Sequence, residues 1–422
     1  MDQESEKVIR FKKWITDHGG SFHPNAIYIQ ASSGYGLVAA EDIPEDQEVV
    51  SCPFDLAVTG PASEAAVSRA LDLGPDTSLS CKQWICIYLV LHWIVGKDSE
   101  ASQHLKHFSY LELLPPQREL LTALYFTEEE LDAFKGTNLY GARNDRFQDW
   151  RTEWTQCREI VSKSKPEWGT QFEWDLYLAA ATYISSRAFP STVLSDTPQL
   201  PRLDDETPSD PVLLPGVDIA NHARGQPVSW ITHTGPDTAV PRVAIVPHRA
   251  TLAGQEIFNN YGPKPNAELI LGYGFTLPNN PDDTIILKVG GINGKKWSIG
   301  RDATGVDGLW NEILRAVRGE EESEHDAAYE TMLDASEALQ EMVSTLLERL
   351  PDPNSVSGKY NIRPYVAQMF GHYYPSHTYC STSGQHSVLT SLLEYSQQKE
   401  REAIELARSQ GIELVMEEED DS

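Results

Sequence analysis

Apolar residues near the start of the chain fall into one helical stretch and three short β-type runs. Residues 6–18 are amphipathic, which predicts an opening helix. The runs IYIQ, LVAA and EVVSCP follow within residues 27–53, separated by SSGYG and DIPEDQ. Because Gly and Pro punctuate these runs, the pattern predicts short meandering strands.

The middle of the chain, from about residue 63 to residue 186, has the apolar spacing of helices. Predicted helices cover Lys82–Val95, a segment that Thr127 and Glu130 open as a capping box, and Glu173–Ser186. The most apolar stretch lies within the first of these. It is too short for the ~20 residues that cross a bilayer, so we expect a buried helix.

β-type sequence returns in PVSWITHT, AVPRVAIVPH and DTIILKVGG, before a second helical region that starts beyond Gly308. A Pro- and Asp-rich segment at residues 191–216 precedes these runs, lacks apolar periodicity and is expected to be a surface loop. We therefore predict a β domain that receives chain from both sides of a helical insert. The predicted parts are residues 1–62 and 181–299 for the two halves of the β domain, 63–180 for the insert, and 300–422 for an all-helical domain with an acidic tail.

Composition narrows the class of protein. The chain has 422 residues, of which 40% are hydrophobic and 23% charged, as in globular multidomain proteins. With 34 basic and 63 acidic side chains, its formal charge of -29 argues against a general nucleic-acid binder and for a basic partner. The five cysteines form no C-x-x-C pair, so we expect neither a disulfide framework nor a metal. His104 and His107 lie in polar sequence, which predicts that they face solvent.

The N-terminus is charged throughout and has no apolar core like that of a secretory signal. Together with the cysteine pattern, which fits a reducing compartment, this predicts a soluble protein of the cytoplasm or the nucleus, without membrane contact. The oligomeric state is left open.

The segment Gly34-Tyr-Gly36-Leu-Val-Ala39 matches the G-x-G-x-x-A pattern of nicotinamide dinucleotide sites. That pattern needs a helix that begins at the glycines, because the helix N-terminus binds the pyrophosphate. The residues that follow are β-branched and interrupted by Pro44, which predicts strands instead. The other interpretation is a tight glycine turn that places backbone groups against a small ligand.

Two further clusters combine polar side chains with Gly-containing turns. The first is LPGVDIANH at residues 214–222, and the second is NNYG with NAELILGYGF at residues 259–275. Taken alone, Asp218 and His222 are compatible with metal ligands or with a structural hydrogen-bonded pair. The aromatic residues of the second cluster, taken alone, are compatible with a β core.

Taken together and in order, GYGLVAAEDI, SSRAF, DIANH and NNYG with NAELILGYGF resemble the motifs of SET-domain protein lysine methyltransferases. The resemblance is to the subgroup of the Rubisco large-subunit methyltransferase and covers almost the whole chain. It implies an α+β SET β-fold with a knot-like C-terminal crossover, split by a helical insert and followed by a helical substrate-binding domain. The Cys-rich zinc motifs that flank many histone-directed SET domains do not occur in this sequence, as in the zinc-free subgroup.

The resemblance also implies which residues bind S-adenosylmethionine. The matching positions are Gly34, Tyr35, Arg187, Asn221, His222 and Phe275. Arg187 is expected to face the carboxylate end of the cofactor, and Asn221 to bind its amino-acid moiety. The backbone of His222 is expected to pair with adenine.

A second set of residues is implied to form the channel for the substrate lysine. Tyr261 and Tyr273 are the expected catalytic residues and channel walls, and backbone carbonyls at Ser186 and Asp218 are expected to receive the amine. The strand at residues 227–234 contributes a further channel residue that the sequence leaves open, with Trp230 as the candidate.

The function implied is an S-adenosylmethionine-dependent protein-lysine N-methyltransferase acting on a basic non-histone protein, with a ribosomal or translation-related protein favoured. Methyl transfer to an amine depends on alignment of the reacting groups, and we expect Tyr261 to orient the amine. Three alternatives stay open. They are a catalytically silent SET-like binding module, a histone lysine methyltransferase, and a redox enzyme that uses nicotinamide.

Overall fold

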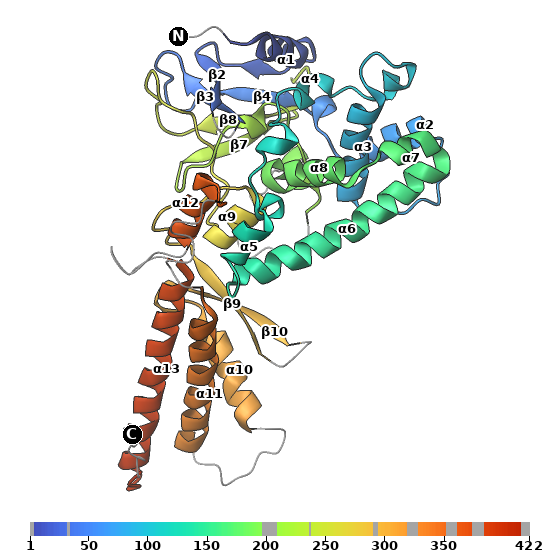
Figure 1. The fold of residues 1–422 in the computed structure, drawn as a ribbon. Helices are drawn as coiled ribbons and strands as arrows, with labels where there is room; N and C mark the ends of the chain where they lie inside the picture. The colour runs from blue at the N-terminus through green and yellow to red at the C-terminus, as the bar shows by residue number, and fades with distance from the viewer. Residues whose placement is uncertain are drawn as a thin grey trace. The chain divides into compact units, whose positions relative to one another are not determined.

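A computed structural model of the chain describes residues 4–31, 34–195, 209–235, 238–289, 294–318, 328–351, 361–373 and 384–414. The chain divides into two compact units (Figure 1). The first comprises Met1–Leu120 and Asp145–Pro263, and the second comprises Leu121–Asn144 and Lys264–Ser422. Each unit therefore combines two stretches that are distant in sequence. The domain boundaries predicted at residues 62, 180 and 299 stay predictions.

The first unit combines short antiparallel strands with helices (Figure 1). Its strands are β1 (Ser21–Phe22), β2 (Ala26–Ala31), β3 (Gly34–Ala39), β4 (Val50–Pro53), β5 (Phe189–Pro190), β6 (Pro211–Val212), β7 (Val228–His233) and β8 (Arg242–Pro247). Its α-helices are α1 (Glu6–Asp17), α2 (Gly60–Leu71), α3 (Cys81–Val95), α4 (Phe108–Leu111), α7 (Pro166–Gln171) and α8 (Trp174–Arg187). The long helix α6 (Asn138–Ser164) contains the boundary between the units.

The strands of the first unit position the segments that carry the predicted site. A four-stranded antiparallel sheet has the order β1-β4-β8-β7, and β2 and β3 form a separate hairpin. Residues 254–257 continue that hairpin, because their backbone groups exchange hydrogen bonds with Leu37 and Ala39. The β3 hairpin is thus tied to the segment that leads directly to Tyr261.

Helices α3 and α8 form the buried helical part of the first unit, where they pack against each other. Helix α3 begins at a capping box formed by Ser80 and Gln83, and every residue from Gln83 to His92 is buried. The apolar stretch is therefore a core helix, as predicted. Among the residues that the structure describes, no helix is long and apolar enough to span a membrane.

The second unit contains helices and one β-hairpin. Its elements are α5 (Glu128–Asp132), α9 (Asn266–Gly272), β9 (Thr284–Val289), β10 (Lys295–Gly300), α10 (Val306–Arg318), α11 (Ala328–Arg349), α12 (Pro364–Tyr373) and α13 (Gly384–Ser409). One hydrophobic core joins Phe134, Ile270 and Phe370. A second core joins the β9–β10 hairpin to α10, α11 and α13, which lie side by side in Figure 1.

An ion pair between Glu130 and Arg363 links α5 and α12, which both contribute to the first of these cores. Glu130 is fully buried and caps α5 with Thr127, as the capping box predicted. Its two carboxylate oxygens also accept hydrogen bonds from the Arg363 guanidinium, both at 2.8 Å. Burial opposes the charge on Glu130, but the bonds from Arg363 and from the Thr127 N–H hold its pKa below the ordinary value. The start of α5 is therefore fastened to the start of α12.

The helices and strands predicted from apolar spacing are confirmed, whereas β1, α9 and β10 are among the elements that this spacing did not indicate. Strand β10 went unrecognised because most of its residues are exposed or half-exposed, so the sequence KKWSIG has little apolar signal. The predicted loop at residues 191–216 is partly wrong. Val212–Gly216 are buried, because β6 pairs with β5 and Leu213 exchanges backbone bonds with Val58. Residues 196–208 of that loop and the acidic tail from residue 415 lie outside the described residues.

Candidate active site

Three segments of the first unit meet around Asn221. Strand β3 pairs with residues 254–257, with Val38 opposite Glu256. The DIANH segment pairs in turn with the NNYG segment, because the Asn259 N–H donates to the Asn221 carbonyl at 2.7 Å and the Ala223 N–H donates to the Asn259 carbonyl at 2.9 Å. The structure therefore brings together the GYGLVAAEDI, DIANH and NNYG motifs, and Arg187 of the SSRAF motif contacts Asp218 of DIANH. The knot-like form of this crossover stays a prediction.

Tyr261 is held at its backbone, its ring and its hydroxyl. Its N–H donates to Nδ1 of His222 at 3.0 Å, and the two rings stack at 5.1 Å between centroids, with 21° between their planes. Its hydroxyl donates to the Ala220 carbonyl at 3.0 Å. The DIANH segment thus fixes the tyrosine that the resemblance marks as central.

Asn221 has an acidic neighbour that the sequence motifs did not indicate. Its Nδ2 donates to Oε1 of Glu256 at 2.7 Å. A Cβ atom on Gly36 would lie 3.1 Å from that oxygen and 3.3 Å from that nitrogen, which is tighter than an ordinary contact. Glycine at position 36 therefore lets the backbone of β3 approach the pair. Glu256 stands outside the sequence motifs, and its pairing with Val38 brings it to Asn221.

Asp218 lies buried between an aromatic hydroxyl and a cation. The Tyr110 hydroxyl donates to Oδ2 of Asp218, and the Arg187 guanidinium donates to the Asp218 backbone carbonyl at 3.0 Å. Burial raises the pKa of Asp218 to about 6, while the Arg187 charge, the Tyr110 bond and the backbone N–H groups limit the rise. This carboxyl therefore titrates close to neutral pH.

The backbone carbonyls predicted to receive an amine have different surroundings. Ser186 lies in the last turn of α8, and the residue four positions further on is Pro190, which has no N–H. No α-helical bond can therefore reach the Ser186 carbonyl. The Asp218 carbonyl already accepts from Arg187, and a second lone pair remains for another donor. The Ser186 hydroxyl donates back to the Thr182 carbonyl, so Ser186 offers its carbonyl.

Two other predicted site residues, Trp230 and Tyr35, contact neighbours within the first unit. The Trp230 indole donates to Oδ1 of Asn259 at 3.0 Å, and its ring packs against Phe189 at 4.8 Å. The Tyr35 hydroxyl lies 3.1 Å from Oγ of Ser5.

Gly34, at the start of β3, has a φ of 116°, which favours glycine. No helix begins within β3, and the next α-helix along the chain, α2, starts at Gly60. The local structure that a nicotinamide pattern requires is therefore missing.

Tyr273 and Phe275 belong to the second unit. Their rings meet edge to face at 6.2 Å, and Nζ of Lys264 lies 5.7 Å from the Tyr273 ring centre. Gly274 between them has a φ of 81°, and a Cβ there would lie 2.8 Å from the Leu121 backbone. The glycine therefore fixes how both aromatic residues leave α9. Their part in a lysine channel or a cofactor site stays a prediction.

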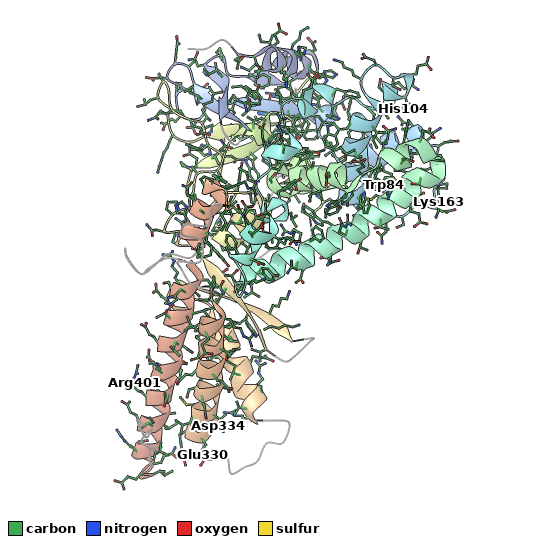
Figure 2. All side chains as sticks on the ribbon, viewed as in Figure 1. Trp84, His104, Lys163, Glu330, Asp334 and Arg401 are labelled. Carbon is green, nitrogen blue, oxygen red and sulfur yellow. The ribbon has the colours of Figure 1, made fainter. Side chains whose placement is uncertain are left out.

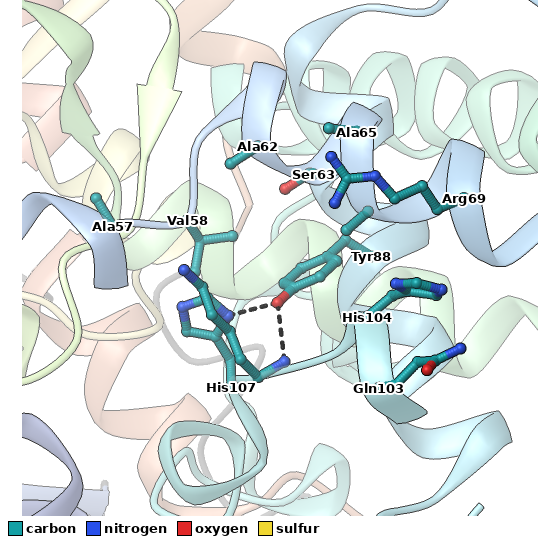
Figure 3. Close-up of a pocket in the computed structure, with 12 residues that line it drawn as sticks. Ala57, Val58, Ala62, Ser63, Ala65, Arg69, Tyr88, Gln103, His104 and His107 are labelled. Atoms are coloured by element: carbon teal, nitrogen blue, oxygen red, sulfur yellow. Dashed lines mark hydrogen bonds between the residues drawn. The ribbon is translucent and has the colours of Figure 1, made fainter. Parts of the chain in front are cut away.

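A cavity of 260 Å³ lies elsewhere in the first unit (Figure 3). None of the predicted site residues lines it. His107, which does, corrects the expectation of an exposed histidine, because it is buried between the Tyr88 hydroxyl at 2.6 Å and the Leu56 carbonyl at 3.0 Å. Burial lowers the pKa of His107 to about 3, so its ring is neutral and structural.

Among the residues that the structure describes, no group of three or more His, Cys, Asp or Glu side chains could hold a metal ion. No protein-family model matches the chain.

The fold is that of a SET-domain protein. The SET domain of LSMT bound to methyllysine and AdoHcy matches with a TM-score of 0.71 and 18% identity, covering 96% of this chain and 94% of that one. A structure of Rubisco LSMT bound to AdoMet matches with a TM-score of 0.69 and 19% identity, covering 95% and 94%. The α+β SET fold with a helical C-terminal region, expected from the sequence, is confirmed.

Several proteins similar in sequence are N-methyltransferases. Ribosomal lysine N-methyltransferase set10 of Schizosaccharomyces pombe is 33% identical over 280 residues, which are 64% of this chain and 46% of that protein. N-lysine methyltransferase SETD6 of Rattus norvegicus is 25% identical over 291 residues, 67% of this chain and 57% of that protein. An actin-histidine N-methyltransferase of the same species is 26% identical over 284 residues, 66% of this chain and 44% of that protein. The chain thus spans about half the length of these relatives. Its fold is similar to that of Rubisco LSMT, and its sequence is similar to that of set10.

Proposed function

We propose that this chain is an S-adenosylmethionine-dependent protein-lysine N-methyltransferase. The main support for the proposal is that β3, the DIANH segment and the NNYG segment converge on Asn221, His222 and Tyr261. Solved structures with this fold hold AdoMet, AdoHcy and methyllysine. Orderly pairing of these segments also counts against a silent relative, because a binding module has no need to keep Tyr261 fixed at three points.

The residues around Asn221 fit a small ligand with an amino-acid group. Gly36 leaves room above the Asn221 amide that a side chain would fill. The Asn221 amide offers polar groups to the amino-acid moiety, and the β3 backbone at Gly34 and Tyr35 offers donors and acceptors beside it. Phe275 and the backbone of His222 complete the proposed cofactor set. When bound, S-adenosylmethionine supplies an activated methyl group.

The role proposed for Arg187 extends the one expected from the sequence. Its guanidinium donates to the Asp218 carbonyl, so part of its role is to hold the DIANH segment in place. Arginine carries five N–H donors, which leaves others to face a carboxylate. We propose that Arg187 both fixes the Asp218 backbone and binds the carboxylate end of the cofactor.

The acceptor amine must be neutral before it can react, although a free lysine has a pKa of ~10.4. A narrow, partly desolvated channel favours the neutral form. We propose that the carbonyls of Ser186 and Asp218 and the hydroxyl of Tyr261 orient the amine, with Tyr273 as a second wall. The main contribution of these groups is alignment of the amine with the methyl group.

The proposed substrate is a basic protein of the translation machinery. The name of the relative at 33% identity, a ribosomal lysine methyltransferase, supports this choice, as does the formal charge of -29, which attracts cationic partners. A histone is the alternative lysine substrate. A histidine acceptor is a second candidate, supported by the similarity to actin-histidine methyltransferases. We place the protein in the cytoplasm or the nucleus, where these substrates occur.

Calorimetry with the full-length chain tests cofactor choice. Wild type should bind S-adenosylmethionine and should not bind NAD. Asn221→Ala should weaken S-adenosylmethionine binding by about 1 to 3 kcal/mol, because polar groups of the ligand lose their partner. Equal affinity of wild type and Asn221→Ala would contradict the assignment of Asn221, and binding of NAD alone would contradict the proposed function.

A further inference from the structure

The contact between Glu256 and Asn221 determines how the asparagine amide is oriented. Nδ2 of Asn221 donates to Oε1 of Glu256 at 2.7 Å. A carboxylate has no proton to donate, so the amide nitrogen, rather than the amide oxygen, must face it. The bond therefore leaves the Asn221 oxygen as the acceptor available to a ligand.

Backbone pairing holds both members of this pair. The Asn221 carbonyl accepts from the Asn259 N–H at 2.7 Å, and Glu256 lies opposite Val38 in an antiparallel bridge. Two backbone bonds, from Ile257 to Leu37 and from Ala39 to Gln255, flank that bridge. Because the flanking backbone is fixed, Glu256 and Asn221 are held within hydrogen-bond reach of each other.

Glu256 and Asn221 also lie directly beside Gly36 of strand β3. A Cβ on Gly36 would come within 3.1 Å of Oε1 of Glu256 and 3.3 Å of Nδ2 of Asn221. Both side chains are half-buried, so a charge there is screened less than one on the open surface. The carboxylate therefore contributes a negative potential at the place where Asn221 offers its oxygen.

We propose that Glu256 is a positioning residue that orients Asn221 toward the α-ammonium group of the cofactor and attracts that group by its charge. The inference rests on the proposed function, because it assigns a part of the same site. It predicts that Glu256 contributes to the binding of ligands that carry an amino-acid group and not to the binding of those that lack one.

Two ligands separate this role from a purely structural one. S-adenosylhomocysteine carries the amino-acid group, whereas 5′-methylthioadenosine has the same adenosine and sulfur without it. Calorimetry should compare the full-length wild type with Glu256→Gln, which keeps an acceptor but loses the charge, and with Glu256→Ala, which loses both. Glu45→Ala is a matched control, because Glu45 is an exposed carboxylate on the same unit.

We expect the dissociation constant for S-adenosylhomocysteine to rise about tenfold in Glu256→Ala, which corresponds to about 1.4 kcal/mol. The rise should be smaller in Glu256→Gln and absent in Glu45→Ala. The constant for 5′-methylthioadenosine should stay within about twofold in all four proteins. Thermal unfolding of each variant shows whether it is folded, and the isosteric Glu256→Gln keeps the test available if Glu256→Ala is not.

Two results would overturn the inference while leaving the proposed function standing. One is unchanged S-adenosylhomocysteine binding in both Glu256 variants, and the other is an equal loss for both ligands, which would mean a structural role only. If wild type itself did not bind S-adenosylhomocysteine, the proposed function and the inference would fail together.

Discussion

At the residue scale, Tyr261 is fixed more firmly than a core aromatic residue requires. Its N–H and its ring both contact His222, and its hydroxyl points to the Ala220 carbonyl. A hydroxyl held at a defined place is suited to orienting a reacting group, because no rearrangement is needed during the reaction.

Replacing Tyr261 by Phe removes this hydroxyl and keeps the ring on His222. We expect the variant to lose about 1 kcal/mol of stability, the typical net contribution of one hydrogen bond, and to bind S-adenosylmethionine as wild type does. Turnover at saturating cofactor should fall by at least tenfold, because this hydroxyl is the group proposed to orient the reacting amine. Near-normal turnover would place catalysis elsewhere.

Asp218 gives the first unit a pH dependence with a defined sign. An unfolded aspartate has a pKa of ~3.9, whereas burial raises the pKa of folded Asp218 to about 6. Between these values the folded state holds the extra proton, so this group makes the protein less stable as pH rises. Above pH 6 its full effect, about 3 kcal/mol for a pKa difference of about 2, is present.

Asp218→Asn should remove this dependence while keeping the backbone carbonyl and an acceptor for the Tyr110 hydroxyl. The free energy of unfolding of wild type should fall relative to the variant between about pH 4 and pH 6. Asp283, whose pKa is also raised to about 6, is present in both proteins, so the difference isolates Asp218. Urea unfolding over this range measures it. A constant difference across the range would mean that Asp218 is not perturbed.

The sequence was informative about some of these residues and uninformative about others. Asn221, His222 and Tyr261 stand in short motifs, and the structure brings all three together. Glu256 and Tyr110 could not be predicted, because each reaches the site through pairing of segments distant in sequence. His107 was wrongly expected to face solvent. Its sequence neighbours are polar and do not indicate its two buried partners, Tyr88 and Leu56.

At the element scale, the clearest case is the capping box at the start of α5. The spacing of Thr127 and Glu130 predicted a helix start, and both reciprocal bonds are present. The pattern could not show that the same carboxylate pairs with Arg363, more than two hundred residues later. Local capping is visible in sequence, whereas the tertiary partner of a cap is not.

Glu130→Ala should therefore cost more than a lost cap alone. We expect the free energy of unfolding to fall by about 2 to 3 kcal/mol, because the Thr127 N–H loses its acceptor in the capping box and Arg363 loses a buried partner. Glu129→Ala is the control, since Glu129 lies in the same turn but is exposed. Chemical denaturation of both variants gives the comparison. Equal effects of the two substitutions would show that the Arg363 pair contributes nothing.

Strand β10 is the opposite case, an element that local sequence does not indicate. β10 has one buried residue, Ile299, so its period is weak in the sequence. It becomes a strand because it pairs with β9 and contributes to the core with α10, α11 and α13. For the same reason, removing the chain after Gly300 would uncover the β9–β10 hairpin, so the substrate role of the helices is better tested by surface substitutions.

At the scale of the whole molecule, the excess of acidic residues reaches the C-terminal helices. Asp334, Glu337 and Glu341 are exposed and recur along one side of α11, where Figure 2 shows Asp334 beside Glu330. Such a charged helix face suits the proposed substrate-binding role, because it attracts lysine-rich proteins over the length of several turns.

Reversing Asp334, Glu337 and Glu341 to Lys should reduce methylation of a basic protein at low salt severalfold, without changing the affinity for S-adenosylmethionine. Each reversal adds two charges, so three change the formal charge from -29 to -23. Reversing Glu41, Glu45 and Glu64, which are exposed on the first unit, makes the same change in net charge and is the control. Equal losses in both triple variants would mean that net charge, and not α11, attracts the substrate.

The division into two units could not be predicted from the sequence. Residues 121–144 lie in a region of uniform helical signal, yet their apolar side chains pack with α9 and α12 rather than with α3 and α8. Apolar spacing reports that a segment has a buried side, but it does not report which partner covers that side.

The central claim is methyl transfer to lysine, and the identity of the labelled amino acid tests it most directly. The full-length chain should be incubated with tritium-labelled S-adenosylmethionine and, in separate reactions, with ribosomal proteins, core histones or actin, beside Tyr261→Phe as the control. Labelled proteins are then hydrolysed to amino acids and the methylated products separated. We predict methyllysine from the ribosomal proteins with wild type and little with the variant. Label found in methylhistidine, or no transfer by a protein that binds the cofactor normally, would contradict the account.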